Sequence, residues 1–222
     1  MNYVEVFPQL RNIGQIIRRC PTPVLRQAYV QSLRDWCNQT HWLRKDITTA
    51  AVSNSGGNGA YYVPLTGDDD TYLEVIAIRS LKGIDTTPSR PREFVIKPGD
   101  PLKWDLTQDV GEPRWYAYRP ESQFDLFPSP DIDYTYRITA VLQPKDDARY
   151  VPEEPLLKHR RVIEAGALAH LFTIPKQPWS DRNEALMQMK VFQAGVNNAK
   201  ADAQRSHNTG SQRIAPRRFL RG

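Results

Sequence analysis

Apolar residues alternate with polar ones in the middle of the chain and recur at three- or four-residue steps on either side of it. From Tyr134 to Leu142 the even positions are apolar and the odd positions mostly polar, which is the pattern of a strand with one buried face. Shorter strand candidates lie at residues 60–63, 72–79, 93–96, 115–118 and 124–127, separated by turns rich in Pro and Gly. We therefore expect a small antiparallel sheet or sandwich within residues 46–150.

The N-terminal flank has the periodicity of helices. Thr22 and Pro23 have the residue types of a helix N-cap and first position, and the apolar positions after them recur at helical spacing up to Trp36 and Cys37. A shorter helix is expected before it, over about residues 8–19.

The C-terminal flank is also helical in pattern. One helix is expected to end before Pro175, and Asp181 with Glu184 has the spacing of a capping box that begins another. This last helix is expected to continue to about His207. Its predicted packing side carries Leu186, Met189, Phe192, Val196, Ala199 and Ala203.

Neither helical flank contains enough apolar residues for a core of its own, so we expect the two to pack together. The predicted fold class is α+β: a discontinuous helical bundle with an inserted antiparallel β domain and an extended C-terminal tail. Residues 1–45 and 151–208 form the helical parts, 46–150 the inserted domain, and 209–222 the tail. The predicted helical core consists of Leu25, Leu33, Trp36, Ile163, Leu168 and Phe172.

The positive charge is concentrated at the C-terminal end. The chain has 30 Lys and Arg against 25 Asp and Glu, for a net charge of +5. The last eighteen residues contain five of the Arg residues and no acidic residue, so residues 1–204 are neutral as a whole. This distribution indicates a basic terminal arm rather than a basic domain. Such an arm fits either a partner protein with carboxylates or the phosphates of a nucleic acid.

The sequence contains no arrangement of residues that requires an enzyme, a metal or a cofactor. The four His residues are scattered, and Ser55-Gly56-Gly57-Asn58-Gly59 lacks the Lys and helix of a phosphate-binding loop. We interpret Asp68-Asp69-Asp70 as a solvated hairpin turn. An enzyme would need converging carboxylates, for which Asp125 with Asp131 or Asp133 is the candidate. No apolar run exceeds four residues, so no membrane-spanning segment is expected.

Four ordered groups of segments resemble the head-to-tail adaptor (connector) proteins of tailed bacteriophages, especially short-tailed ones. The family has a Cys-Pro start, a helix ending in a Phe/Trp-Cys pattern, and a basic C-terminal end. The matching segments here are residues 20–25 (CPTPVL) with 33–42 (LRDWCNQTHW); 111–113 (GEP) with 124–130 (FDLFPSP) and 142–144 (LQP); 151–154 (VPEE) with 162–168 (VIEAGAL); and 175–179 (PKQPW) with 192–196 (FQAGV).

The resemblance implies a structural virion protein of the neck or tail, assembled in the host cytoplasm. Such adaptors form a homo-oligomeric ring, commonly dodecameric, beneath the portal protein. The ring extends the channel through which genomic DNA is ejected without specific binding, and it docks the next tail component, a nozzle or tail tube protein. Their C-terminal segment inserts into the portal. The alternative is a nucleic-acid-binding protein that uses the basic C-terminal arm.

By this resemblance the portal-binding residues are in the last turn of the final helix and in the tail. Arginine guanidinium groups can pair with portal carboxylates, and two neighbouring apolar side chains can serve as an anchor. The predicted portal-binding residues are Arg205, Arg213, Arg217, Arg218, Phe219, Leu220 and Arg221. No membrane partner, cofactor or metal is expected.

Overall fold

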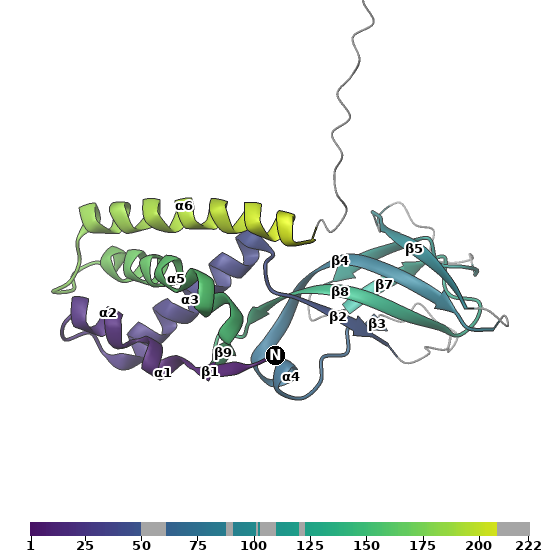
Figure 1. Cartoon of the computed structure of the whole chain (residues 1–222), viewed down its shortest axis with the longest axis horizontal. Helices are drawn as coiled ribbons and strands as arrows, with labels where there is room; N and C mark the ends of the chain where they lie inside the picture. Colours follow the sequence, from purple (N-terminus) through teal and green to yellow (C-terminus); the bar gives the residue numbers. More distant parts are fainter. Residues whose placement is uncertain (50–60, 88–90, 101, 103–109, 120–122, 208–222) are drawn as a thin grey trace, which may run out of the picture.

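A computed structural model describes residues 1–49, 61–87, 91–100, 102, 110–119 and 123–207 of the chain, with the side chains of residues 205–207 left out. Helices lie at one end of the molecule and a curled sheet lies at the other (Figure 1). The strands of the sheet all come from the sequence between two long helices, α3 and α5. The fold is therefore mixed α and β, as the periodicities predicted.

The helices are stacked in three levels. Helices α3 (Thr22–Thr40) and α5 (Glu153–Thr173) contact each other in the middle, and α6 (Arg182–His207) lies across both on one side. The short helices α1 (Val6–Gln9) and α2 (Arg11–Ile16) contact α3 and α5 from the other side (Figure 1). The helical layer thus has two outer faces, one formed by α6 and the other by α1 and α2.

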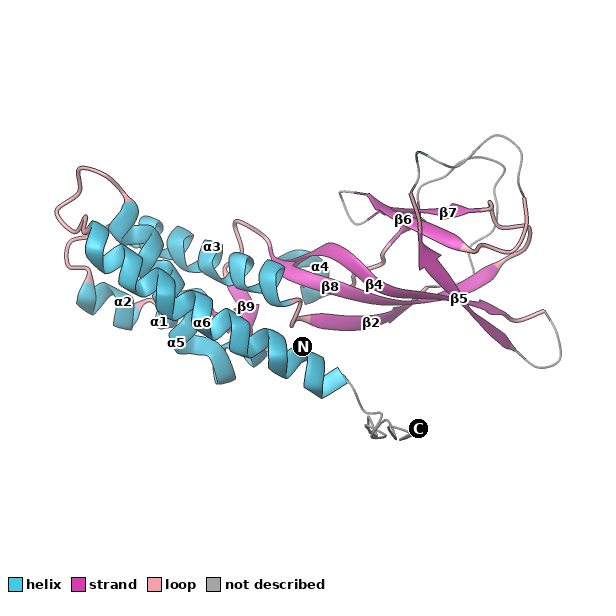
Figure 2. Ribbon diagram, turned by 90° about the horizontal axis from the view of Figure 1, so that it is seen from above, coloured by secondary structure: helices cyan, strands magenta, loops and turns pink. Residues whose placement is uncertain are grey.

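The sheet has the strand order β2-β8-β4-β5-β6-β7-β3 in the described part of the chain. Strand β8 is near one end of this order and pairs with β2 and β4, and the later strands curl away from them (Figure 2). The strands are β2 (Arg44–Thr48), β3 (Tyr61–Tyr62), β4 (Leu73–Asp85), β5 (Arg92–Pro98), β6 (Trp115–Arg119), β7 (Gln123–Phe127) and β8 (Tyr134–Pro144).

The alternation predicted for β8 is present. Tyr134, Tyr136 and Ile138 are buried, whereas Arg137 is exposed. The rings of Tyr61 and Phe124 pack against Tyr136 on the buried face, so the curled sheet encloses its own apolar interior.

A two-stranded ribbon and a short helix occupy the junction between helices and sheet. Strand β1 (Tyr3–Glu5) pairs with β9 (Tyr150–Pro152), which leads directly into α5. Helix α4 (Asp68–Tyr72) lies beside this ribbon, on the opposite side of the junction from α6 (Figure 1). The N-terminus is thereby held beside the strand that returns the chain to the helices.

Five of the six residues predicted for the helical core are buried. Leu33, Trp36 and Ile163 have no exposed surface. Leu25 and Leu168 are nearly buried, and Phe172 is partly buried at the edge of the same apolar cluster.

Several local predictions were wrong. The sheet is not wholly antiparallel, because β5 and β6 pair in parallel. The expected turn at Asp68–Asp70 is the helix α4, since Asp69 is buried and bonded to side chains of other elements. Helix α3 begins at Thr22 with Pro21 as its N-cap, so the Thr22 side chain caps nothing.

The last helix also differs from its prediction in two respects. Leu186 and Met189 are exposed, because the buried stripe of α6 instead begins at Ala185 and continues through Phe192. Asp181 accepts hydrogen bonds from the backbone N–H groups of Asn183 and Glu184. In a complete capping box the Glu184 side chain would accept a hydrogen bond from the Asp181 backbone N–H. Here that N–H donates to the Phe172 carbonyl instead.

Candidate functional site

Most of the residues predicted to bind a portal protein lie outside the described residues. Arg205 is in the last turn of α6, where only the backbone is described. The others, Arg213, Arg217, Arg218, Phe219, Leu220 and Arg221, follow the last described residue. Portal binding by these residues remains a prediction. The described residues form the helices and the sheet that precede them in the chain.

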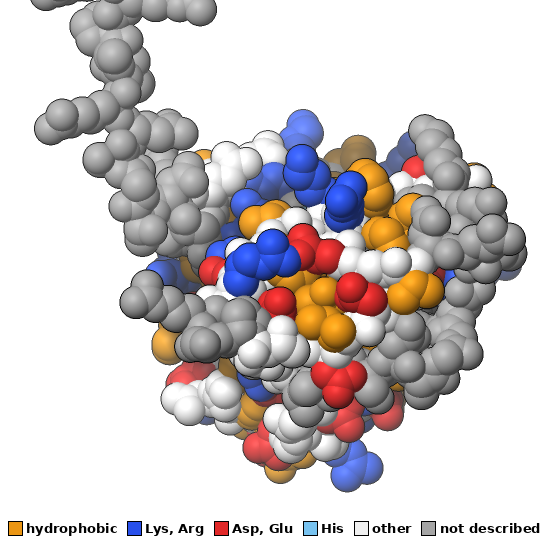
Figure 3. Space-filling view, turned by 90° about the vertical axis from the view of Figure 1, so that its right-hand side faces the viewer, with side chains coloured by type: hydrophobic (Ala, Val, Ile, Leu, Met, Phe, Trp, Pro, Cys, Tyr) orange, Lys and Arg blue, Asp and Glu red, His pale blue; other side chains and the backbone are white. Residues whose placement is uncertain are grey.

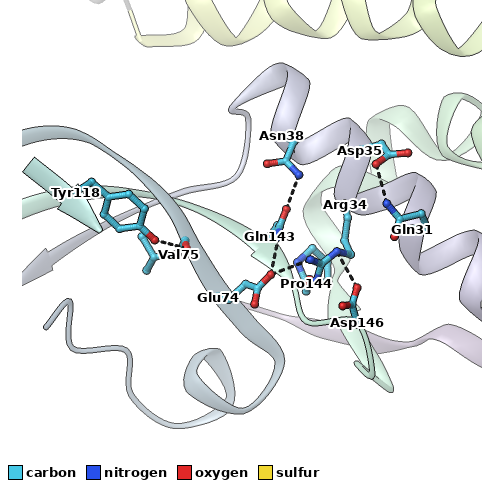
Figure 4. A network of polar contacts seen from close by, with 10 residues as sticks. All are labelled: Gln31, Arg34, Asp35, Asn38, Glu74, Val75, Tyr118, Gln143, Pro144 and Asp146. Atoms are coloured by element: carbon cyan, nitrogen blue, oxygen red, sulfur yellow. Dashed lines mark hydrogen bonds and ion pairs between the residues drawn. The ribbon is translucent and has the colours of Figure 1, made fainter. Parts of the chain in front are cut away.

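Arg34 of α3 connects the helices to the sheet (Figure 4). Its guanidinium donates to the Pro144 carbonyl at 2.8 Å and lies 3.0 Å from carboxylate oxygens of Glu74 and Asp146. These three partners belong to the end of β8, the start of β4 and the turn after β8. One planar cation therefore holds the ends of two paired strands against α3.

A chain of amides continues this junction beside Arg34. Asn38 donates to the side-chain oxygen of Gln143 at 2.7 Å, and Gln143 donates in turn to Glu74 (Figure 4). Gln143 is buried, so its amide depends on these two partners. Further along β4, the Tyr118 hydroxyl donates to the Val75 carbonyl at 2.6 Å and fixes the curl of the sheet.

Asp69 anchors α4 to the junction. Its carboxylate accepts hydrogen bonds from the Tyr3 hydroxyl and the Lys45 ammonium group. Burial tends to raise the pKa of Asp69, but the bonds from Lys45 and Tyr3 outweigh it and lower the pKa below the ordinary value. The neighbours Asp68 and Asp70 are exposed, and within the described residues neither forms an ion pair.

A basic pocket lies on the outer face of strands β2, β8 and β4. It has a volume of about 380 Å³ and is lined by Arg44, Asp46, Arg79, Ser80 and Thr139. Arg79 is the extra residue of a β-bulge, because the pairing of β4 with β8 shifts register between Ile78 and Ser80. The bulge places its guanidinium beside Arg44.

The floor of the pocket is a row of hydroxyl groups and one carboxylate. Ser80 donates to the Thr139 hydroxyl at 2.9 Å, and Thr139 donates to Asp46 at 2.7 Å. Arg44 donates through Nε to the His41 carbonyl at 2.7 Å, which leaves the outer edge of its guanidinium directed to the pocket.

Positive charges gather around this pocket. Burial lowers the pKa of Arg44, and the nearby Arg79 lowers it further. Burial also lowers the pKa of His41, and Arg44, Arg79 and Lys200 add to the effect. Lys200 belongs to α6, so the cationic cluster spans the sheet and the last helix. Such a cluster is chemically suited to an anionic partner.

Two of the carboxylates proposed for an enzyme are bonded to other side chains in the described structure. Asp125 pairs with Arg119 at 2.5 Å, and Asp131 accepts a hydrogen bond from Tyr134 at 2.7 Å. Within the described ranges no group of three or more His, Cys, Asp and Glu side chains is placed to hold a metal ion. No helix in those ranges has the length and apolarity to cross a membrane.

The sheet end of the molecule carries charges of both signs among apolar side chains (Figure 3). Glu93 lies between Lys82 and Arg137, at 3.5 and 3.1 Å, and Arg92 pairs with Glu112. Because most of these groups are paired and exposed, this end offers a mixed polar surface rather than a basic one.

Sequence reasoning missed the basic pocket, although a signal for it exists. Residues Leu73, Val75, Ile78 and Leu81 are buried along β4. The spacing changes from two to three after Val75 and stays at three up to Leu81, because register shifts leave first Ile76 and then Arg79 as extra residues. Such a change of period identifies Arg79 as a residue whose side chain does not follow the in-and-out alternation of the strand.

The comparisons with known proteins agree with the resemblance seen in the sequence. No curated protein matches the chain. The family described as SU10 adaptor protein matches residues 1–217, which is nearly the whole chain. The chain therefore belongs to the SU10 adaptor protein family and is a phage head-to-tail adaptor, a structural component of the virion neck.

Proposed function

We propose that the protein forms a ring beneath the portal, with residues 1–204 as a neutral body and the basic C-terminal tail as the segment that attaches it. The supporting observation is the family match over residues 1–217, which includes the helices, the sheet and the first part of the tail. The ring extends the DNA channel and offers a docking surface to the next tail component. A dodecamer is the proposed copy number, by analogy with the family.

The four-part division of the chain is part of this proposal. The helical parts, 1–45 and 151–208, form the body, and the segment 46–150 supplies the sheet that projects from it, apart from the first two residues of β2. The tail, 209–222, inserts into the portal, where its arginines pair with carboxylates and Phe219 and Leu220 fill an apolar cleft. Ordering the tail costs about 1–2 kcal/mol per residue in backbone entropy, so attachment depends on several copies acting together.

The test is removal of the tail from the full chain. A variant lacking residues 213–222 is expected to keep the helix content of the intact protein by circular dichroism and to lose binding to purified portal protein. A matched variant, with Phe219→Ser and Leu220→Ser, keeps the charge and tests the apolar anchor alone. Portal binding that survives the deletion would contradict the proposal.

The same variants test the nucleic-acid alternative. A DNA-binding arm would give a mobility shift whose affinity falls steeply with salt and disappears with the tail. We expect only weak DNA binding, already lost at physiological salt. Tight DNA binding through the tail, together with no binding to the portal, would favour the alternative.

A further inference from the structure

We propose that the basic pocket of one subunit binds the exposed carboxylates of Asp68 and Asp70 from a second copy of this chain. The inference rests on the proposed ring and adds the surfaces through which neighbouring subunits meet. It is carried by the position of the pocket and of α4 on opposite faces of the molecule, and by their opposite charges.

The pocket has the chemistry of a carboxylate site. Two guanidinium groups, Arg44 and Arg79, line it, and within the described residues neither is paired with a carboxylate. Planar guanidinium groups bind carboxylates through two parallel hydrogen bonds. The pocket accommodates one or two side chains, and Asp46 on its floor accepts hydrogen bonds, so a protein segment with backbone N–H groups fits it better than an extended row of phosphates.

The acidic surface is provided by α4. Asp68 and Asp70 are exposed, while Asp69 between them is buried and holds the helix in place through Lys45 and Tyr3. The two outer carboxylates are therefore presented on a fixed support. Because α4 is already held in place, less conformational entropy is lost when a second molecule binds to it.

The register of β2 places these two surfaces on opposite faces. Successive side chains of a strand point to opposite faces of a sheet. Lys45 reaches Asp69 of α4, whereas its neighbour Arg44 lines the pocket. Copies that repeat around a ring in one orientation bring one face of each subunit against the opposite face of the next. The α4 face of one copy then meets the pocket face of its neighbour.

The helical layer has a matching arrangement of apolar side chains. On the α6 side, Leu186, Met187 and Val191 are each more than half exposed. On the α1 and α2 side, Phe7 and Ile16 are also more than half exposed. If the pocket of one copy meets α4 of the next, these two apolar surfaces also face each other across the same interface.

The experiment exchanges the charges in full-length chains bound to purified portal. Arg44→Glu with Arg79→Glu, and separately Asp68→Lys with Asp70→Lys, are each expected to reduce the number of copies on the portal about tenfold at a fixed subunit concentration. The chain with all four substitutions is expected to recover the wild-type number, because its altered pocket receives the altered α4. Copy number is counted by native mass spectrometry.

A matched control changes the net charge equally at a distant surface. Lys97→Glu with Arg114→Glu, two exposed residues of the sheet end, is expected to leave the copy number unchanged. Circular dichroism confirms that each variant is folded. Normal copy number in either charge-reversed pair, or failure of the four-fold variant to recover, would overturn the proposal.

Two further outcomes distinguish failure of this interface from failure of the proposed ring. If the wild-type chain forms no ring on the portal, the proposed function fails and the interface fails with it. If Arg44→Glu with Arg79→Glu leaves the ring complete but weakens retention of duplex DNA, the pocket belongs to phosphates, and only the interface is refuted.

Discussion

At the scale of single residues, two glycines permit close contact between helices of the helical layer. A Cβ at Gly166 would lie 2.2 Å from the Ser32 hydroxyl and 2.7 Å from the Phe192 ring. A Cβ at Gly195 would lie 2.3 Å from Val162. Side chains of α3 and α6 thus occupy the space where Gly166 of α5 has no Cβ, and Val162 of α5 does the same at Gly195 of α6.

Gly166→Ala is expected to destabilise the protein by about 1–3 kcal/mol, because the new methyl group has no space between Ser32 and Phe192. Denaturant unfolding monitored by circular dichroism measures the change. Gly14→Ala is the matched control: its Cβ would make an ordinary contact at 3.7 Å with Leu25, so the higher helix propensity of Ala should leave stability unchanged or raised. Equal changes in the free energy of unfolding for the two variants would contradict the prediction that Gly166 has no space for a methyl group.

At the scale of elements, the sequence predicted where helices and strands occur but not how their ends are satisfied. Each predicted strand overlaps an observed one, because alternation reports burial of one face. The first strand of the sheet, β2, was missed, since Arg44–Thr48 contains one buried apolar residue, Ile47. Its position depends on pairing with β8, a contact between distant parts of the chain that no local pattern encodes.

The same limit applies to the candidate site. The basic tail could be recognised from composition alone, whereas the pocket brings together residues from β2, β4 and β8 through sheet pairing and one bulge. Leu186 and Met189 are exposed but were assigned to the core. Helical spacing shows that apolar residues share one side of a helix, but it does not show which side faces the neighbouring helices. The direction is set by Ala185 and Phe192, which fit against α5 and α3.

Helix α5 contains a local irregularity at His159 that predicts a pH dependence. His159 has non-helical backbone angles, and its ring lies within 5.0 Å of the ring centres of Trp36 and Trp42. Burial lowers the pKa of His159, the carboxylate of Asp202 opposes this, and Lys158 adds to it. The folded state therefore favours the neutral ring, whereas the unfolded state takes up a proton near the ordinary pKa of about 6.5.

Stability is expected to be constant above that value and to decrease as the pH falls below it. His159→Phe retains an aromatic ring that cannot be protonated, so its stability should decrease less between about pH 7 and pH 5. Urea unfolding midpoints of the two proteins across this range provide the measurement. The pKa of His41 is also lowered, so His41→Asn is measured in parallel to separate its share. Identical pH profiles for wild type and His159→Phe would contradict the prediction.

At the scale of the whole molecule, the junction determines whether the helices and the sheet behave as one unit. The chain passes from helix to sheet after α3 and returns through β9, and the ribbon of β1 and β9 closes the same junction. Arg34 lies between these connections and bonds to the ends of both β4 and β8. Because this one side chain contacts both strand ends and α3, its loss should loosen the attachment of the sheet to the helices.

Arg34→Met should therefore cost more than the loss of an ordinary surface ion pair. Its side chain is 15% exposed, and hydrogen bonds to charged groups of this kind contribute about 1.5–3 kcal/mol. Arg160→Met is the matched control, because Arg160 pairs with Glu164 inside one helix, where such pairs contribute about 0.3–0.5 kcal/mol. Denaturant unfolding gives both values. Hydrogen exchange should show that only Arg34→Met increases exchange in β4 and β8 as well as in α3. If exchange increases in α3 alone, the sheet is held by other contacts, and the junction does not couple the two halves of the subunit.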